Sequence, residues 1–118
     1  MVKILIVDDE DSLRELLAKA VERKGTPVIQ AKNGLEAIDL YQKHKPQCVF
    51  LDVMLEDMDG IEVFKKIKQI NPQANVYFIS GSDNKKFKEI AKNLGARGYM
   101  VKPVLLDEVM AIIQNLDK

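Results

Sequence analysis

Acidic, hydroxyl and basic side chains stand directly after short apolar runs at four places along the chain. These residues are Asp8, Asp9, Asp52, Ser80 and Lys102. If the runs are parallel strands, the polar groups converge, because the carboxyl ends of parallel strands lie at one edge of a sheet. Three carboxylates close together repel one another unless a cation holds them. Hard oxygen ligands without histidine or cysteine suit Mg²⁺, so the pattern predicts a magnesium site.

The two remaining groups are suited to phosphate. The ammonium of Lys102 is a mobile point charge for one phosphoryl oxygen, and the hydroxyl of Ser80 can donate to another. We interpret Asp52 as the reactive centre, because it ends the apolar run 48–51 and precedes an acidic loop that closes with Asp59-Gly60. Any one of these residues alone is more often a helix cap, a turn former or a surface charge. Their shared placement at strand ends favours a site that binds or carries phosphate.

Five apolar runs of strand type alternate with five segments of helical spacing. The strand-type runs are 4–7, 27–31, 48–51, 76–79 and 99–101. The run that begins with Pro27 is expected at a sheet edge. Asn33 and Asp83 are expected to cap the second and fourth helices. The alternation predicts an α/β fold, with a doubly wound parallel sheet, helices on both faces and right-handed crossovers.

Composition limits the class of protein. A chain of 118 residues that is 47% apolar is large enough for one domain with a core. Lys+Arg and Asp+Glu are equal at 18 each, so net charge gives no argument for nucleic acid. The single cysteine excludes an internal disulfide. The apolar run near the start of the chain is too short for a signal peptide or a membrane span, so a soluble cytoplasmic protein is expected.

Four segments together resemble the signature of the response-regulator receiver domain of two-component signalling. They are VDDE at 7–10, LDVMLEDMDG at 51–60, SGS at 80–82 and YMVKP at 99–103. The resemblance covers the whole chain, so we expect a single receiver domain over residues 1–118. It implies a flavodoxin-like fold with five helices and the strand order 2-1-3-4-5.

The resemblance also implies a role for each motif residue. Asp52 is expected to accept a phosphoryl group from the phosphohistidine of a sensor histidine kinase, with Ser80 and Lys102 contacting the acyl phosphate. Tyr99 is expected to be the aromatic partner of Ser80 in a conformational switch. The Lys102-Pro103 peptide bond is expected to be cis. The implied Mg²⁺ ligands are Asp9, Asp52, the Met54 carbonyl and, through water, Asp8.

Output is expected to pass through a protein surface. Because the chain ends just after the fifth helix, it is similar to single-domain regulators that act as phosphorelay intermediates or diffusible messengers. We expect a monomer that contacts the kinase and a downstream protein or phosphotransferase, with no direct nucleic-acid or membrane contact. A small apolar rim is expected to dock a kinase helix bundle, unless both of its leucines belong to the core. The rim residues are Leu13, Leu16, Pro103 and Val104.

Other interpretations stay open. The chain could be a receiver fragment of a longer regulator, or a degenerate receiver that binds partners without phosphorylation. Two other classes of protein are disfavoured. A small aspartyl-phosphate phosphatase would need an acid at position 54, which is Met54. A flavin carrier would need a glycine- and hydroxyl-rich loop after the first strand, where this chain has DDEDS. A structural adaptor needs no acid cluster. We therefore favour a signalling domain over an enzyme.

Overall fold

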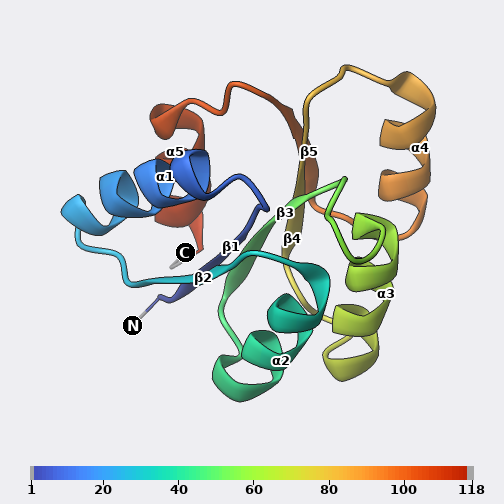
Figure 1. Cartoon of the computed structure of the whole chain (residues 1–118), viewed down its shortest axis with the longest axis horizontal. Coiled ribbons are helices and arrows are strands. Elements are labelled where there is room, and N and C mark those ends of the chain that lie inside the picture. Colours follow the sequence, from blue (N-terminus) through green and yellow to red (C-terminus); the bar gives the residue numbers. More distant parts are fainter. Residues whose placement is uncertain (1, 117–118) are drawn as a thin grey trace.

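A parallel sheet lies between two layers of helices in the computed structural model, which describes residues 2–116 (Figure 1). The strands are β1 (Ile4–Val7), β2 (Val28–Ala31), β3 (Cys48–Asp52), β4 (Val76–Ser80) and β5 (Gly98–Val101). The helices are α1 (Asp11–Arg23), α2 (Gly34–His44), α3 (Gly60–Ile70), α4 (Lys85–Asn93) and α5 (Leu106–Asn115). None of these helices is long and apolar enough to cross a membrane, within the described residues.

The strand order is β2-β1-β3-β4-β5, and every neighbouring pair is parallel. The predicted fold class and strand order are therefore confirmed. β2 lies at an edge, as its proline indicated. Pairing starts at Val28, after the residue that lacks an N–H, while the Pro27 carbonyl still accepts a hydrogen bond from the Ile4 amide at 3.1 Å.

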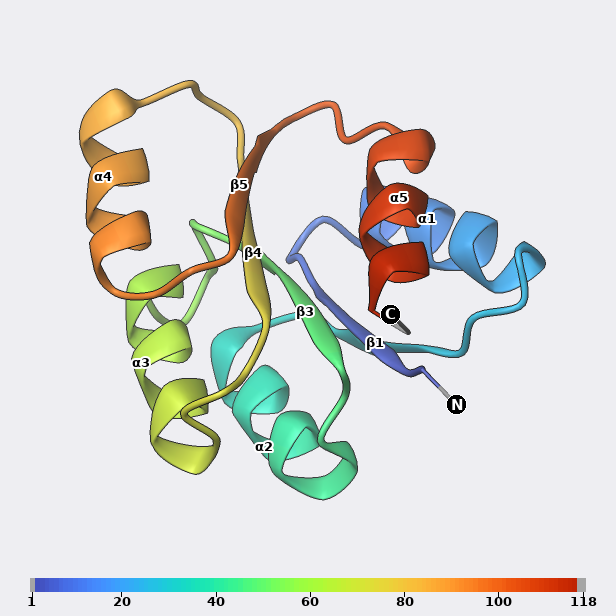
Figure 2. The ribbon, with the colours of Figure 1, turned by 180° about the vertical axis from the view of Figure 1, so that it is seen from behind.

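Successive strand side chains enter two different cores, because neighbouring residues of a strand point to opposite faces. Leu5 and Val7 of β1 pack in the core beneath α2, α3 and α4. Ile4 and Ile6 pack in the core beneath α1 and α5. Figure 2 shows α1 and α5 together on one side of the sheet and the other three helices on the opposite side. β1 and β3, in the middle of the sheet, are buried on both faces.

One of the two predicted N-caps is correct. The Asn33 side chain accepts a hydrogen bond from the Glu36 amide at 2.8 Å at the start of α2. Asp83 does not cap α4, because its neighbour Asn84 accepts from the Phe87 amide at 3.1 Å instead. Both residue types cap helices well, so the local pattern does not decide between adjacent positions. The Asp83 carboxylate forms an ion pair with Lys88.

The apolar stripe of α1 differs from its sequence pattern. Leu13 and Leu16 are 46% and 67% exposed, so the alternative that both belong to the core is wrong. The buried residues of α1 are Arg14, Ala18 and Val21. The helix therefore turns a charged side chain inward and two leucines outward.

Candidate functional site

The carboxyl ends of β1 and β3 bring the predicted acids together. Val7 pairs with Leu51, so the residues that follow them in the chain, Asp8 and Asp52, lie next to each other. Asp8, Asp9 and Asp52 each offer a carboxylate oxygen, and these oxygens lie within 4.8 Å of one another. Asp8 and Asp52 are buried, whereas Asp9 is half-buried. The predicted acid cluster is thus present at the sheet edge.

Asp52 is held by a main-chain donor and a cation. Its Oδ1 accepts from the Met54 amide at 3.0 Å, and its Oδ2 lies 2.9 Å from the Lys102 ammonium nitrogen. Burial raises the pKa of the Asp52 carboxyl, and the nearby Asp8 charge acts in the same direction. The Lys102 ammonium and the Met54 N–H favour the ionised form and offset part of that rise.

Lys102 reaches three carboxylates from the end of β5. Besides Asp52, its Nζ lies 3.3 Å from Asp8 Oδ2 and 3.4 Å from Glu10 Oε1. Burial alone would lower the pKa of the Lys102 ammonium, but the Asp52 and Asp8 carboxylates outweigh burial and raise it. The lysine is therefore firmly charged, and it neutralises part of the acid cluster. The Lys102-Pro103 peptide bond that follows is cis.

Glu10 is a site residue that sequence reasoning did not single out. Besides its contact with Lys102, its main-chain N–H donates to Asp8 Oδ1 at 2.9 Å. The signal was available in the run of three acids after β1, but only the first two were assigned a role. Glu10 lies at the exposed rim of the site, where its charge is well solvated.

Ser80 stands at the end of β4 and is 8% exposed. Its Oγ accepts from the Ser82 amide at 3.2 Å, which leaves the hydroxyl hydrogen for another acceptor. The Tyr99 hydroxyl donates to the Ser82 carbonyl at 2.9 Å, so the predicted partners Ser80 and Tyr99 meet through Ser82. The serine, Asp52, Met54 and Lys102 line one open cavity of about 500 Å³.

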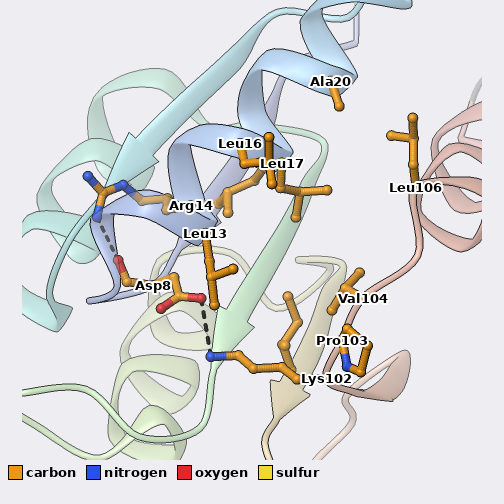
Figure 3. A pocket seen from close by; sticks show the side chains of 12 residues that line it. Asp8, Leu13, Arg14, Leu16, Leu17, Ala20, Lys102, Pro103, Val104 and Leu106 are labelled. Atoms are coloured by element: carbon orange, nitrogen blue, oxygen red, sulfur yellow. Dashed lines mark hydrogen bonds and ion pairs between the residues drawn. The ribbon is translucent and has the colours of Figure 1, made fainter.

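The predicted rim residues lie beside this cavity in a separate apolar groove. Figure 3 shows the leucines of α1 on one wall and Pro103 and Val104 on the other. The groove has a volume of about 550 Å³ and also reaches Asp8 and Lys102. Its apolar lining includes Leu13, Leu16, Leu17, Pro103, Val104 and Leu106. All four rim residues are therefore brought together by the fold.

Residues 4–114 of the chain match the family described as the response regulator receiver domain. The chain belongs to this family. The receiver assignment made from the four sequence motifs is thus confirmed.

The receiver is similar both to a relative of about its own length and to a relative about twice as long. Sporulation initiation phosphotransferase F of Bacillus subtilis (strain 168) is 37% identical over 113 residues, which cover 96% of this chain and 91% of the relative. The alkaline phosphatase synthesis transcriptional regulatory protein of the same strain is 40% identical over 114 residues, covering 97% of this chain but 48% of that protein. The chain therefore spans most of one relative and about half of the other.

A similar fold has been solved with a modified aspartate. A response regulator from Burkholderia pseudomallei, crystallised with a phosphorylated aspartic acid, a calcium ion and citrate, matches this receiver with a TM-score of 0.89 and 26% identity. The match covers 99% of this chain and 69% of that one.

Proposed function

We propose that this receiver accepts a phosphoryl group on Asp52 from a phosphohistidine of a sensor kinase or phosphotransfer protein. The observation that carries the proposal is the ion pair at 2.9 Å between buried Asp52 and half-buried Lys102, within an acid cluster at the strand ends. The phosphorylated aspartate and calcium ion named for the Burkholderia relative support it. Phosphoryl transfer depends mainly on positioning and charge neutralisation, and these residues supply both.

The donor set at the cluster fits Mg²⁺, because all its ligand atoms are oxygens within 4.8 Å of one another. Asp9, Asp52 and the Met54 carbonyl would hold the ion directly, and Asp8 through water. When bound, the ion supplies positive charge that neutralises the phosphoryl oxygens.

The protein groups have separate parts in the transfer. An Asp52 carboxylate oxygen attacks phosphorus in line, the P–N bond to the histidine breaks, and the imidazole leaves with the electron pair. The Lys102 ammonium moves from the carboxylate to a phosphoryl oxygen, and the Ser80 hydroxyl donates to another. Because Ser80 and Tyr99 both contact Ser82, movement of Ser80 changes the support of the Tyr99 hydroxyl. A local charge change is thereby passed to the surface beside β5.

Intact mass spectrometry after incubation with acetyl phosphate tests the proposal. Wild type is expected to gain the mass of one phosphoryl group in Mg²⁺ and none in EDTA. Asp52→Asn should gain none, whereas Asp39→Asn, which alters an exposed acid of α2, should behave as wild type. No gain by wild type in Mg²⁺ would contradict the proposal and favour a degenerate receiver that acts as a binding module.

The apolar groove between α1 and the loop after β5 supports a second, related proposal about the donor. A segment seated there lies directly beside Asp8 and Lys102, so it is placed to deliver a phosphohistidine to Asp52. We propose that a helix of the histidine-bearing donor docks in this groove, as the four rim residues suggested.

Leu16 and Leu35 form a matched pair for testing the groove. They are 67% and 68% exposed, but Leu35 lies in the first turn of α2 and does not line the groove. The assay uses the histidine kinase that, among those tested, phosphorylates wild type fastest. Phosphotransfer from this kinase should be several-fold slower to Leu16→Ala and unchanged to Leu35→Ala. Labelling by acetyl phosphate should stay unchanged in both variants, because this small donor needs no docking. Equal kinase rates for Leu16→Ala and wild type would remove the groove from the donor interface.

A further inference from the structure

Arg14 is a buried cation with no part in the chemistry proposed above. It lies on α1, one turn after the acidic loop, and is 8% exposed. Its neighbours Leu13 and Leu16 are far more exposed, so α1 buries a charge in preference to two leucines. Removing a guanidinium from water is costly unless hydrogen bonds replace its hydration. The partners of Arg14 therefore indicate what its burial achieves.

The guanidinium joins three segments. Its Nη1 donates to the Asp8 carbonyl at 2.8 Å and lies 2.8 Å from Asp11 Oδ1, while its Nε donates to Gln30 Oε1 at 3.1 Å. Asp8 follows β1, Asp11 begins α1, and Gln30 lies in the edge strand β2. The acidic loop is thereby tied at once to a helix and to a strand. Lysine could not replace this arrangement, because a single ammonium lacks the fixed fork of donors.

Asp8 is consequently held at both its main chain and its side chain. Its N–H donates to the Ala31 carbonyl at 3.1 Å, and its own carbonyl accepts from Arg14. Its carboxylate, on the opposite side, faces Lys102 at 3.3 Å. Figure 3 shows the arginine and the lysine on either side of Asp8, each joined to it by a dashed line. Arg14 therefore fixes the backbone and leaves the carboxylate free to point toward Asp52.

We propose that Arg14 is a positioning residue for the metal site of this receiver. By holding the Asp8 carbonyl against α1 and β2, it keeps the Asp8 and Asp9 carboxylates where they can bind Mg²⁺ together with Asp52. The inference rests on the proposed function, in which this cluster binds the ion. Arg14 acts through the main chain of the loop.

A simple charge effect would have the opposite sign. Arg14 is a cation near the cluster, so its removal reduces repulsion of Mg²⁺ and, by charge alone, tightens binding. A positioning role predicts weaker binding, because the carboxylates lose their alignment. Loss of a group that orients metal ligands typically weakens metal affinity by about tenfold or more. The direction of the change therefore separates the two explanations.

The test compares the Mg²⁺ dissociation constants of Arg14→Met, Arg14→Lys and Arg23→Met by titration calorimetry of the metal-stripped chain. Arg23 is the matched control, because it is an exposed arginine in the last turn of the same helix. We expect Arg14→Met to bind about tenfold more weakly, Arg14→Lys to recover part of the loss, and Arg23→Met to match wild type. Mg²⁺ should also raise the unfolding midpoint. This rise should be smallest in Arg14→Met, intermediate in Arg14→Lys, and equal to that of wild type in Arg23→Met.

Gln30→Ala provides a further variant that keeps the arginine and removes only its β2 partner. It should weaken Mg²⁺ binding less than Arg14→Met does. If Arg14→Met does not fold, wild-type affinity in both Arg14→Lys and Gln30→Ala overturns the inference.

Other results would also contradict it. Equal or tighter binding by folded Arg14→Met, or an equal loss in Arg23→Met, overturns the positioning role alone. Failure of wild type to bind Mg²⁺ overturns the proposed function together with this inference.

Discussion

At Asp52, the proposed phosphoacceptor, burial and an ion pair act in opposite directions on one carboxyl group. The pKa of Asp52 is raised by burial and by the charge of Asp8, despite the opposing ammonium of Lys102. A carboxyl group with a raised folded-state pKa binds its proton more tightly in the folded protein than in the unfolded chain. The stability it contributes is complete below its ordinary value of 3.8 and is lost as pH rises through the raised value. The site is therefore under electrostatic strain at neutral pH when metal is absent.

Asp52→Asn should remove this strain. In EDTA at neutral pH, we expect the variant to unfold at a higher temperature than wild type, because an amide carries no charge to bury. The difference should shrink as pH falls from the raised value toward 3.8, and below 3.8 it should be smallest, because the wild-type carboxyl is then protonated in both the folded and the unfolded state. Thermal unfolding followed by circular dichroism over a pH series measures this, with Asp39→Asn as the exposed-acid control. An Asp52→Asn midpoint equal to or below that of wild type at neutral pH would disagree with the proposed electrostatics.

Among the secondary-structure elements, α3 starts in close contact with the main chain at the end of β3. A Cβ added at Gly60 would lie 2.6 Å from the Asp52 carbonyl oxygen and 2.8 Å from the Val53 carbonyl oxygen. Both atoms belong to the main chain, so the clash cannot be relieved by rotating a side chain. The glycine at the start of α3 therefore allows the helix to pack against the strand that carries Asp52.

Gly60→Ala should consequently destabilise the protein by about 1–3 kcal/mol, the range for an overpacked site. It should also slow labelling by acetyl phosphate, because the end of β3 must move. Gly81→Ala is the matched control. A Cβ at Gly81 meets nothing within 4 Å, although Gly81 lines the cavity that contains Asp52. Urea unfolding and intact-mass time courses measure the two effects. Wild-type stability in Gly60→Ala would show that the contact is easily relieved.

The loop after β3 is also joined to α2. The carboxylate of Asp57 accepts from the amides of Gly34 at 2.8 Å and Leu35 at 3.0 Å, at the first turn of that helix. Burial tends to raise the pKa of Asp57, but these N–H donors outweigh it and lower the pKa. Stability from this contact is therefore present above the ordinary value of 3.8 and is lost as pH falls.

Asp57→Ala should cost about 1 kcal/mol at neutral pH, as loss of a helix cap typically does. The cost should diminish in acid, where the wild-type carboxyl is protonated. Glu56→Ala, an exposed acid next to it in the chain, is expected to change little. Urea unfolding of the three proteins at neutral and acidic pH measures these differences, and equal costs for the two variants would argue against a specific link to α2.

At the scale of the whole molecule, the order of strands and helices was predictable from the sequence, and so was the convergence of the strand-end residues, whereas two contacts between distant segments were not. Alternating strand and helix signals predict the sheet, and the sheet alone places Asp52 and Lys102 at one edge. The burial of Arg14 depends on acceptors in two other segments, one of them the β2 residue Gln30. Likewise, the contact of Asp57 with α2 spans 23 positions to Gly34, so no local pattern indicates it.

Cys48 provides a probe of global unfolding. It lies at the start of β3 with no exposed surface, and burial raises the pKa of its thiol to about 12. The thiolate that reacts with alkylating reagents is therefore scarce as well as inaccessible in the folded protein. At mildly alkaline pH, iodoacetamide should label native protein very slowly and urea-unfolded protein quickly. Rapid labelling without denaturant would mean that the central strand opens locally.

The central claim, that Asp52 carries the phosphoryl group, is tested most directly by locating the modification. Sodium borohydride reduces an aspartyl phosphate to homoserine and leaves free carboxylates unchanged, so peptide mass spectrometry can identify the labelled position. After treatment with acetyl phosphate and Mg²⁺, we predict homoserine at position 52 and at none of the neighbouring acids, with no conversion in EDTA. Homoserine at Asp8 or Asp9, or none at any position, would contradict the assignment of Asp52 as the phosphoacceptor.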